Sequence, residues 1–289
     1  MESSTTVLER LHGKFDSMTR AERQLANSLL DNYPVSGLSS ITAVAQTAGV
    51  STPTVARMVQ KLGFKGFPQF QTSLRHELAA KFSSPLEKHA NWAESAPQSH
   101  LLNRFTDAVI QNLRQTLGRI DPDTFDAACE MLAAADRSIN VVGGRITQSL
   151  ADYFYKHMQV VRPGVSHIPS SSNTWTHYVL DMTPGDVLVI FDIRRYENTI
   201  LKFAHMAHDR GVNIILFTDQ WGSPVSKIAK HRFNCRIEVP SAWDSSVVTM
   251  LLIETMVAAV QEQTWAGTKD RMKTLEGLFD ETRLFRKFT

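Results

Sequence analysis

The hydrophobic positions of this chain change their spacing near residue 138. Before that point, apolar residues recur at the intervals of three and four that are typical of amphipathic helices. After it, apolar runs of strand length alternate with helical patterns, at 138–142, 165–169, 187–191, 213–218 and 233–239. The central runs are apolar on both faces, as in a parallel sheet covered by helices on both sides. The sequence therefore predicts an all-α N-terminal domain followed by an α/β domain with a five-stranded, doubly wound parallel sheet.

Two short helices joined by a tight turn are predicted between residues 41 and 70. Apolar residues keep a helical spacing over 41–48, and the pattern breaks at Gly49. Glycine adopts without steric cost the left-handed conformation in which chains leave helices. Ser51 or Thr52 can then cap the next helix. A small residue at Ala45, glycine four positions later and an apolar residue six positions after that form the pattern of a DNA-binding helix-turn-helix.

The second helix combines an apolar face with a donor-rich one. Val55, Met58, Val59 and Leu62 form the face expected to pack inward. The side chains expected to contact DNA are Ser51, Thr52, Thr54, Arg57, Gln60, Lys61 and Lys65. The stretch from Asn32 to His76 contains no Asp or Glu, whereas solvated faces usually carry both signs of charge. We therefore expect double-stranded DNA as a partner.

An ordinary helical hairpin in a protein core is the alternative, because helix pairs with a glycine turn are common. The spacing alone does not separate the two interpretations, and the missing acidic residues favour DNA binding. Phe64, Phe67 and Phe70 follow the helix pair and raise a similar question. Aromatic rings can stack on bases, but phenylalanines beside glycines are more typical of a core.

Composition and length agree with a globular chain of two domains. The chain has 289 residues, of which 43% are hydrophobic and 21% charged, and a net charge of +2. No apolar run approaches the ~20 residues that span a bilayer, and the N-terminus lacks the pattern of a signal peptide. Cys129 and Cys235 stand far apart in apolar surroundings, so we expect reduced packing residues in a cytoplasmic protein. The expected domains are 1–82, a linker at 83–100, 101–265 and a helical tail at 266–289.

The segment GVSTPTVARMVQKLGFKGFPQF, residues 49–70, resembles the end of the N-terminal domain of RpiR-type bacterial transcription regulators. The family's pattern is GVS-x-x-TV-x-R followed by KLGFKGF. The second domain of that family is a SIS (sugar isomerase) fold, and the predicted order of strands and helices resembles it throughout. The resemblance implies a regulator that binds DNA through its first domain and a carbohydrate derivative through its second.

The loops that would hold a ligand differ from the SIS pattern. In parallel sheets, ligands bind beyond the carboxyl ends of the strands, where helix starts present backbone N–H groups. SIS domains that bind phosphosugars carry a G-x-G-x-S loop and an S-x-S-G-x-T loop there. The first loop of this chain is GGRITQS and the second is DIRRYEN, so the phosphate cradle is changed. The candidate ligand-binding residues are Gly143, Arg145, Thr147, Asp192, Arg194, Arg195 and Thr199.

The three arginines lie in loops that lead into helices, and the dipole at the N-terminus of a helix disfavours cations. An anionic ligand would offset that cost, and the planar guanidinium suits a carboxylate or a phosphate. We expect only one of the adjacent Arg194 and Arg195 to face inward, with Asp192 accepting from a hydroxyl or an amine. The alternative is a degenerate pocket whose arginines form salt bridges at a subunit interface. His157 lies on an apolar helix and is expected in the core.

These observations predict a transcription regulator, more typical of a repressor, whose SIS-like domain senses a small anionic metabolite. We expect a homodimer or homotetramer on an inverted-repeat operator, and no cofactor, metal, catalytic residue or membrane partner. A SIS-fold sugar-phosphate isomerase is one alternative, for which Glu254 is the acid we would nominate as the base. A DNA-binding protein with a purely structural second domain is the other.

Overall fold

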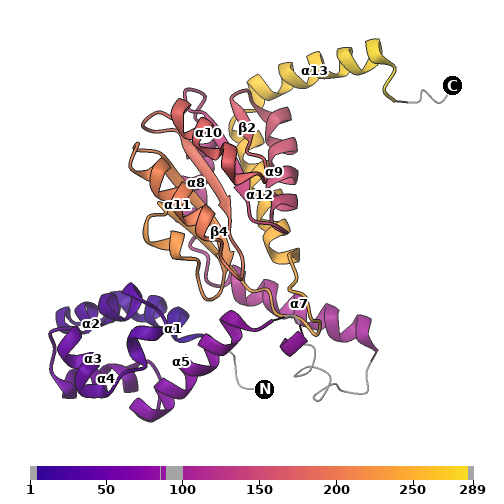
Figure 1. The fold of residues 1–289 in the computed structure, drawn as a ribbon. Coiled ribbons are helices and arrows are strands. Elements are labelled where there is room, and N and C mark those ends of the chain that lie inside the picture. Colours follow the sequence, from indigo (N-terminus) through magenta and orange to yellow (C-terminus); the bar gives the residue numbers. More distant parts are fainter. Residues whose placement is uncertain (1–4, 85, 89–99, 286–289) are drawn as a thin grey trace. The chain divides into compact units, whose positions relative to one another are not determined.

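The computed structural model describes residues 5–84, 86–88 and 100–285. They divide into two compact units, coloured indigo to purple and magenta to yellow in Figure 1. Of the described residues, the N-terminal unit holds those up to 88, and the C-terminal unit holds nearly all of those from 100 onward. In the predicted linker, residues 85 and 89–99 lie outside the described residues.

The N-terminal unit is helical, as predicted. Its elements are α1 (Val7–Lys14), η1 (Phe15–Ser17), α2 (Arg20–Asp31), η2 (Val35–Gly37), α3 (Ile41–Thr47), α4 (Thr52–Lys61) and α5 (Phe67–Phe82). Thr6 and Thr19 begin α1 and α2 with capping boxes, in which the threonine and a glutamate three residues later satisfy each other's backbone N–H. The local sequence therefore fixes where both helices start.

One apolar cluster holds these helices together. It includes Leu11 of α1, Leu25 of α2, Val44 of α3 and Met58 of α4, all of them buried. Phe64 and Phe70 are buried at its edge, with ring centroids 5.6 Å apart, and Phe67 is partly buried. The prediction that these aromatic residues belong to the core is confirmed.

The C-terminal unit contains the predicted five-stranded sheet, in which all neighbouring strands are parallel. Its strands are β1 (Ile139–Gly143), β2 (Val165–His167), β3 (Val187–Phe191), β4 (Asn213–Asp219) and β5 (His231–Cys235), in the spatial order β2-β1-β3-β4-β5. The order reverses at β1 and β3, the place where doubly wound sheets bind ligands. The sheet therefore positions a candidate site at the carboxyl ends of these two strands.

Helices cover both faces of the sheet, and the central strands β1, β3 and β4 are therefore buried almost throughout. Leu188, Ile190 and Leu216 pack on one face with α10 (Trp175–Asp181) and α11 (Asn198–His208). On the other face, Phe154 of α9 (Gln148–Val161) contacts Phe191 with ring centroids 6.2 Å apart. Also on that side are α8 (Pro122–Ala133) and α12 (Val247–Gln263), and α12 runs beside α9 in Figure 1.

Two further helices frame this unit. The helix α7 (Leu101–Leu117) packs against α12 and β5, and α13 (Trp265–Thr282) packs against α9 and α12. Cys129 and Cys235 are buried free thiols, as expected. Among the described residues, no helix is long and apolar enough to cross a membrane.

The predicted bounds of the last strand are wrong. The last strand was expected at 233–239 and is observed at His231–Cys235. It ends there because the N–H of Arg236 donates to Thr116 Oγ1 of α7, at 3.0 Å, and no longer to the sheet. A single 3₁₀ turn, η4 (Pro224–Lys227), lies between β4 and β5.

Candidate nucleic-acid interface and candidate ligand site

The turn between α3 and α4 has the predicted geometry. Gly49 has a φ of 64°, in the left-handed region that favours glycine. Its N–H donates to the carbonyl of Gln46 at 3.1 Å, and the N–H of Val50 donates to Ala45 at 2.9 Å. These hydrogen bonds end α3 and turn the chain directly into α4, as a helix-turn-helix requires.

The first turn of α4 is fixed by Ser51. Its hydroxyl accepts a hydrogen bond from the N–H of Thr54 at 3.3 Å, the contact of an N-cap residue. The hydroxyl of Thr54 lies 2.9 Å from the same oxygen, and Thr54 is only 9% exposed. The expectation that Thr54 lies on the outward face of the helix is therefore wrong.

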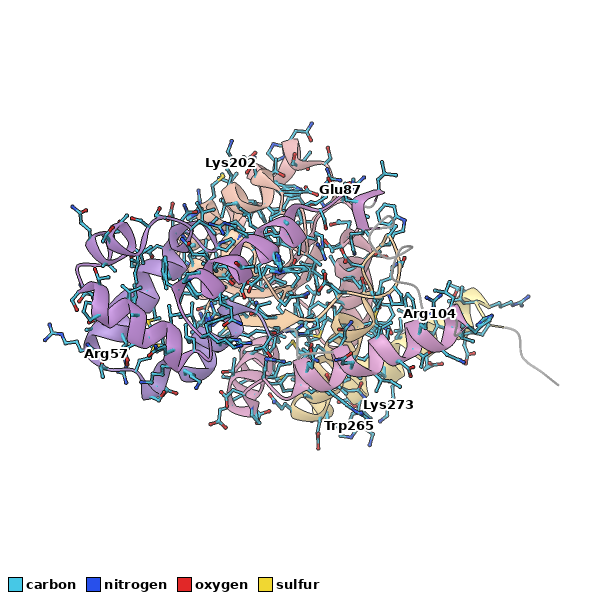
Figure 2. The ribbon with its side chains drawn as sticks, turned by 90° about the horizontal axis from the view of Figure 1, so that it is seen from below. Arg57, Glu87, Arg104, Lys202, Trp265 and Lys273 are labelled. Carbon is cyan, nitrogen blue, oxygen red and sulfur yellow. The ribbon has the colours of Figure 1, made fainter. Side chains whose placement is uncertain are left out.

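Most of the other expected DNA-contacting residues are exposed. Ser51, Arg57 and Gln60 are exposed along α4, Lys65 is exposed just after it, and Thr52 is half-buried. Figure 2 shows Arg57 pointing away from the ribbon of the N-terminal unit. The outward side of α4 therefore presents a guanidinium, an amide and a hydroxyl within about three turns, and these groups can pair with base edges and phosphates.

Lys61 does not lie free on that surface, contrary to expectation. Its Nζ lies 2.9 Å from Glu22 Oε2 and donates to the carbonyl of Ser17 at 2.6 Å. The Glu22 pKa is lowered, first by the backbone N–H of Thr19 and also by Lys61, against the opposing effect of burial. Lys61 therefore connects the end of α4 to α2, and its charge is already compensated.

The candidate ligand site lies at the carboxyl ends of β1 and β3, which are neighbours in the sheet. Gly143 ends β1, and a Cβ on it would lie 2.5 Å from the backbone of Thr147. Thr147 Oγ1 accepts from the N–H of Gly144 at 2.8 Å and donates to the carbonyl of Phe191 at 2.6 Å. These two candidate residues therefore shape the turn and fasten it to β3, and the threonine hydroxyl already has two partners.

Asp192 begins the second loop in a buried position. It is 3% exposed, and its carboxylate accepts a hydrogen bond from the hydroxyl of Ser223. Burial raises the pKa of Asp192 to about 7, and the carboxylates of Asp219 and Glu197 also raise it. We expected Asp192 to accept from a hydroxyl of the ligand. In the structure one of its oxygens already accepts from a hydroxyl of the same chain, that of Ser223.

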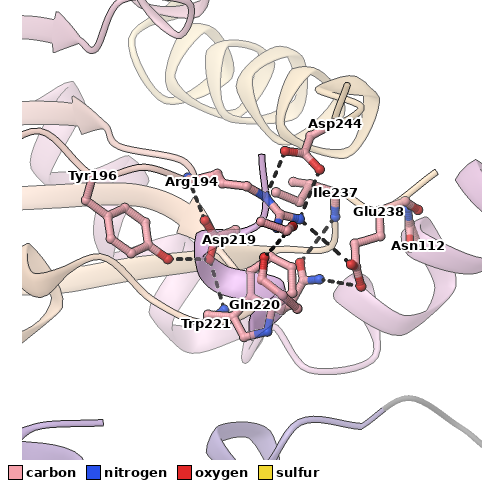
Figure 3. Close-up of polar contacts among 11 residues, drawn as sticks. Asn112, Arg194, Tyr196, Asp219, Gln220, Trp221, Ile237, Glu238 and Asp244 are labelled. Carbon is pink, nitrogen blue, oxygen red and sulfur yellow. Dashed lines mark hydrogen bonds and ion pairs between the residues drawn. The ribbon is translucent and has the colours of Figure 1, made fainter. Parts of the chain in front are cut away.

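Of the two adjacent arginines, Arg194 faces inward and Arg195 is exposed. The side chain of Arg194 is 7% exposed, and its Nε lies 2.9 Å from Asp244 Oδ2. Its guanidinium lies over the indole of Trp221, 4.2 Å from the ring centroid. Figure 3 shows this side chain directed at Asp244 and Glu238 of its own unit. It is therefore committed to internal partners.

The backbone of this loop is held by Asp219, at the end of β4. Its carboxylate accepts from the N–H of Arg194 at 2.7 Å, the hydroxyl of Tyr196 at 2.7 Å and the N–H of Trp221 at 2.9 Å. Burial raises the pKa of Asp219, and these hydrogen bonds oppose that rise. They also hold Arg194 and Arg195 at φ values of 41° and 53°, a conformation that costs less for the glycine of the SIS pattern.

The same cluster reaches α7. Gln220 Nε2 donates to Glu238 Oε2 at 3.2 Å, and Gln220 Oε1 accepts from the N–H of Ile237 at 3.3 Å. The carbonyl of Glu238 accepts from Asn112 Nδ2 of α7 at 2.8 Å (Figure 3). A continuous set of polar contacts therefore joins the second loop, β4 and the first helix of the C-terminal unit.

The three arginines of the two loops do not all face the same surroundings. Arg145 and Thr199 are exposed like Arg195, and Arg194 is turned to its carboxylates. The oxygen acceptors missed by the sequence reasoning are Glu197, Asp219, Glu238 and Asp244. A signal for Glu197 existed, because it occupies the threonine position of S-x-S-G-x-T when Asp192 occupies the first serine.

Two other expectations concern residues away from these loops. Glu254 is exposed on α12, and its Oε1 accepts from the hydroxyl of Tyr153 at 2.9 Å. His157 is exposed, with its ring 4.5 Å from that of Tyr153, so its expected place in the core is wrong. Within the described part of the chain, no group of three His, Cys, Asp or Glu residues has the arrangement of a metal site.

Comparison with known families assigns both units. Residues 5–81 match the helix-turn-helix domain of the rpiR family, and residues 131–259 match the SIS domain. The HTH-type transcriptional regulator HexR of Pseudomonas aeruginosa is 25% identical over 226 residues, 76% of this chain and 75% of that protein. HexR of Escherichia coli is 21% identical over 287 residues, 96% of this chain and 95% of that protein.

Two solved structures share the fold. The sugar isomerase domain of the RpiR transcription factor from Sphaerobacter thermophilus is 22% identical, with a TM-score of 0.56, over 61% of this chain and 97% of that one. The Vibrio vulnificus NanR protein complexed with ManNAc-6P is 17% identical, with a TM-score of 0.54, over 94% of this chain and 97% of that one. At these identities the likeness shows the fold alone.

A helix-turn-helix DNA-binding domain followed by a SIS domain defines a class of two-domain transcription regulators. The chain belongs to the RpiR family of these regulators, as the matches of its helix-turn-helix domain and of its SIS domain show together.

Proposed function

We propose that this chain is a repressor that binds an inverted-repeat operator as a dimer and responds to a small anionic sugar derivative. The observation that carries the DNA-binding part is the outward side of α4, where Arg57 and Gln60 are exposed. The stretch from Asn32 to His76 contains no acidic residue, so no carboxylate from it opposes a phosphate backbone. Two copies related by a two-fold axis would present two equivalent α4 helices to two half-sites.

The effector would bind at the carboxyl ends of β1 and β3, where the strand order reverses. NanR, a protein of the same fold, is complexed with ManNAc-6P, which supports a phosphorylated sugar. The exposed Arg145 and Arg195 belong to the two loops at this edge and suit either a phosphate or a sugar carboxylate. We expect no turnover of aldose or ketose phosphates.

The polar contacts around Arg194 could couple the carboxyl ends of β1 and β3 to DNA binding. A ligand that moves the second loop would change the contacts of Arg194 with Asp244 and Glu238. The backbone of Glu238 is bonded to Asn112 of α7, the helix that follows the inter-domain segment in the sequence. An effector needs only a different affinity for two arrangements of these contacts to change operator affinity.

The DNA-binding part is tested by fluorescence anisotropy with a duplex selected from a random library by the full-length protein. Arg57→Ala should cost about 1–3 kcal/mol of binding free energy if Arg57 contacts a base. Lys202→Ala is the matched control, because Lys202 is an exposed cation on α11 (Figure 2). Equal losses for both variants, or no loss for Arg57→Ala, would contradict the proposed interface.

The effector part is tested with the same duplex and full-length protein. Panels of sugar phosphates and sugar acids, titrated separately, should yield a compound that changes operator affinity roughly tenfold, within the usual range of allosteric coupling. If no compound in either panel changes the affinity, the sensing function fails while DNA binding remains.

A further inference from the structure

The carboxylate of Glu197 lies inside the turn that follows β1. Its Oε1 accepts a hydrogen bond from the backbone N–H of Arg145 at 2.7 Å. The same oxygen lies 2.9 Å from the point that a Cβ on Gly144 would occupy, and the carboxylate carbon lies 3.4 Å from that point. The carboxylate is therefore packed against the open side of a glycine, in space that only a glycine leaves free.

This contact has the chemistry of a bound anion. A charged oxygen that accepts a backbone N–H at 2.7 Å, against a bare glycine Cα, makes the hydrogen bond that a phosphate or carboxylate ligand would make in the same turn. Here the anion comes from the chain itself, from the residue that precedes α11 and belongs to the loop after β3. A second anion cannot occupy the same position, because like charges at contact distance repel strongly.

Other donors of the turn are already engaged. The N–H of Gly143 donates to Gln148 Oε1 at 2.9 Å, and the N–H of Gly144 donates to Thr147 Oγ1 at 2.8 Å. These two acceptors lie within five residues of their donors, and the N–H of Gly144 also donates to the backbone carbonyl of Phe191 at 3.2 Å, so these bonds belong to the turn and to the end of the sheet. The bond from Arg145 is different, since its acceptor is a charged oxygen at the end of a partly exposed side chain from another loop. It is the bond that a ligand can replace without rebuilding the turn.

We propose that Glu197 is the specificity-determining residue of this site and acts as an internal competitor for the anionic group of the effector. A phosphate or carboxylate enters the turn after β1 only when the Glu197 carboxylate leaves it. The affinity of this site for anions is therefore set by this one side chain. The proposal relies on the proposed function for the location of the effector, but the behaviour of the site can be measured without DNA.

The test is isothermal titration calorimetry of the full-length protein with inorganic phosphate and, separately, with ribose 5-phosphate. Glu197→Thr removes the carboxylate and places threonine where the SIS pattern has it. Glu197→Gln keeps an oxygen acceptor and removes the charge. Glu262→Gln, at an exposed position on α12, is the matched control for the loss of one negative charge.

We expect Glu197→Thr to bind both probes at least about tenfold more tightly than the unchanged protein, which corresponds to 1.4 kcal/mol. Glu197→Gln should show a smaller gain, and Glu262→Gln none. The inference is overturned if neither Glu197 variant binds either probe more tightly, or if the control gains as much. If Glu197→Thr does not fold, Glu197→Gln alone decides between these outcomes.

Failure of this inference differs from failure of the proposed function. If the Glu197 variants gain phosphate affinity but no metabolite changes operator binding by the unchanged protein, Glu197 is a competitor and the sensing function is wrong. If a metabolite changes operator binding equally in the unchanged protein and in Glu197→Thr, sensing is correct and the role of Glu197 is wrong.

Discussion

Arg194 and Asp244 form a two-point ion pair within the C-terminal unit, although 50 residues separate them in the sequence. Nε of the arginine lies 2.9 Å from one carboxylate oxygen of the aspartate, and Nη2 lies 3.1 Å from the other. The arginine side chain is 7% exposed and the aspartate side chain 22% exposed. A planar guanidinium paired in this way holds two loops at a fixed distance.

We predict that Arg194→Ala destabilises the C-terminal unit by about 2–3 kcal/mol, because it leaves a largely buried carboxylate without its partner. Arg194→Lys should recover only part of the loss, since an ammonium cannot make both contacts. Chemical denaturation followed by circular dichroism measures both variants. Arg195→Ala is the matched control: this neighbour is exposed, and its loss should stay within about 0.5 kcal/mol. Equal losses at the two positions would show that the ion pair contributes nothing specific.

This ion pair also marks the limit of what the sequence could predict. The helix-turn-helix and the parallel sheet follow from local signals: apolar spacing, Gly49 and the cap at Ser51. The two ligand loops were singled out by their resemblance to the SIS pattern. The direction of Arg194 depends on Asp244 and Glu238, which only the folded chain brings near it. A charged residue in a loop is expected to pair with an opposite charge. Its position in the sequence does not say whether that charge belongs to a ligand or to the same chain.

Lys61 and Glu197 illustrate the same limit in two forms. Lys61 has the spacing of an outward residue on α4, but Glu22, 39 positions earlier, lies within its reach. No local pattern contains that information. For Glu197, the motif itself placed an acid where SIS loops have threonine, so the departure was visible. Its destination, the N–H of Arg145 on the neighbouring loop, required the strand order and register of the sheet.

The stability of the C-terminal unit should fall as the pH rises from about 4 to about 7. Burial raises the pKa of Asp192 from its ordinary value near 3.8 to about 7, so between these values the folded protein binds a proton that the unfolded chain does not. Asp192→Asn keeps an oxygen acceptor for Ser223 and removes this titration. Each unit of pKa difference corresponds to about 1.4 kcal/mol.

Denaturant titrations at pH 5 and pH 8 measure this effect. The loss of stability between the two values should be smaller in Asp192→Asn than in the unchanged protein, and Asp181→Asn, at an exposed position, should leave it unchanged. An identical pH dependence in all three proteins would show that Asp192 is already ionised at pH 5.

Gly143→Ala should destabilise the C-terminal unit by about 2–4 kcal/mol, within the range for overpacking and distorted backbone. The added Cβ would lie 2.5 Å from backbone atoms of Thr147 and 2.6 Å from the backbone nitrogen of Gln148, and backbone cannot move aside as a flexible side chain can. Gly267→Ala is the matched control, because a Cβ there has no neighbour within 4 Å and lies inside α13. It should be neutral or stabilising by up to about 1 kcal/mol. Thermal melting of both variants decides; a Gly143→Ala protein as stable as the control would contradict the close packing of this turn.

The two lysines near the end of α4 should have different roles: Lys61 should stabilise the N-terminal unit, and Lys65 should contribute to DNA binding. Lys61→Ala should lower the stability of the N-terminal unit by about 1 kcal/mol, because the partly buried carboxylate of Glu22 loses its ion pair. The effect should disappear at acid pH: the Glu22 pKa is lowered from its ordinary value, so the stability that ionised Glu22 contributes is lost as the pH falls through its folded value. Lys65→Ala should leave stability unchanged and weaken binding to all duplexes, reducing by about one the slope of log affinity against log salt.

Urea denaturation at pH 7 and pH 3, with anisotropy at several salt concentrations, separates the two residues. If Lys61→Ala kept full stability but reduced the slope of log affinity against log salt, Lys61 would belong to the DNA-contacting surface.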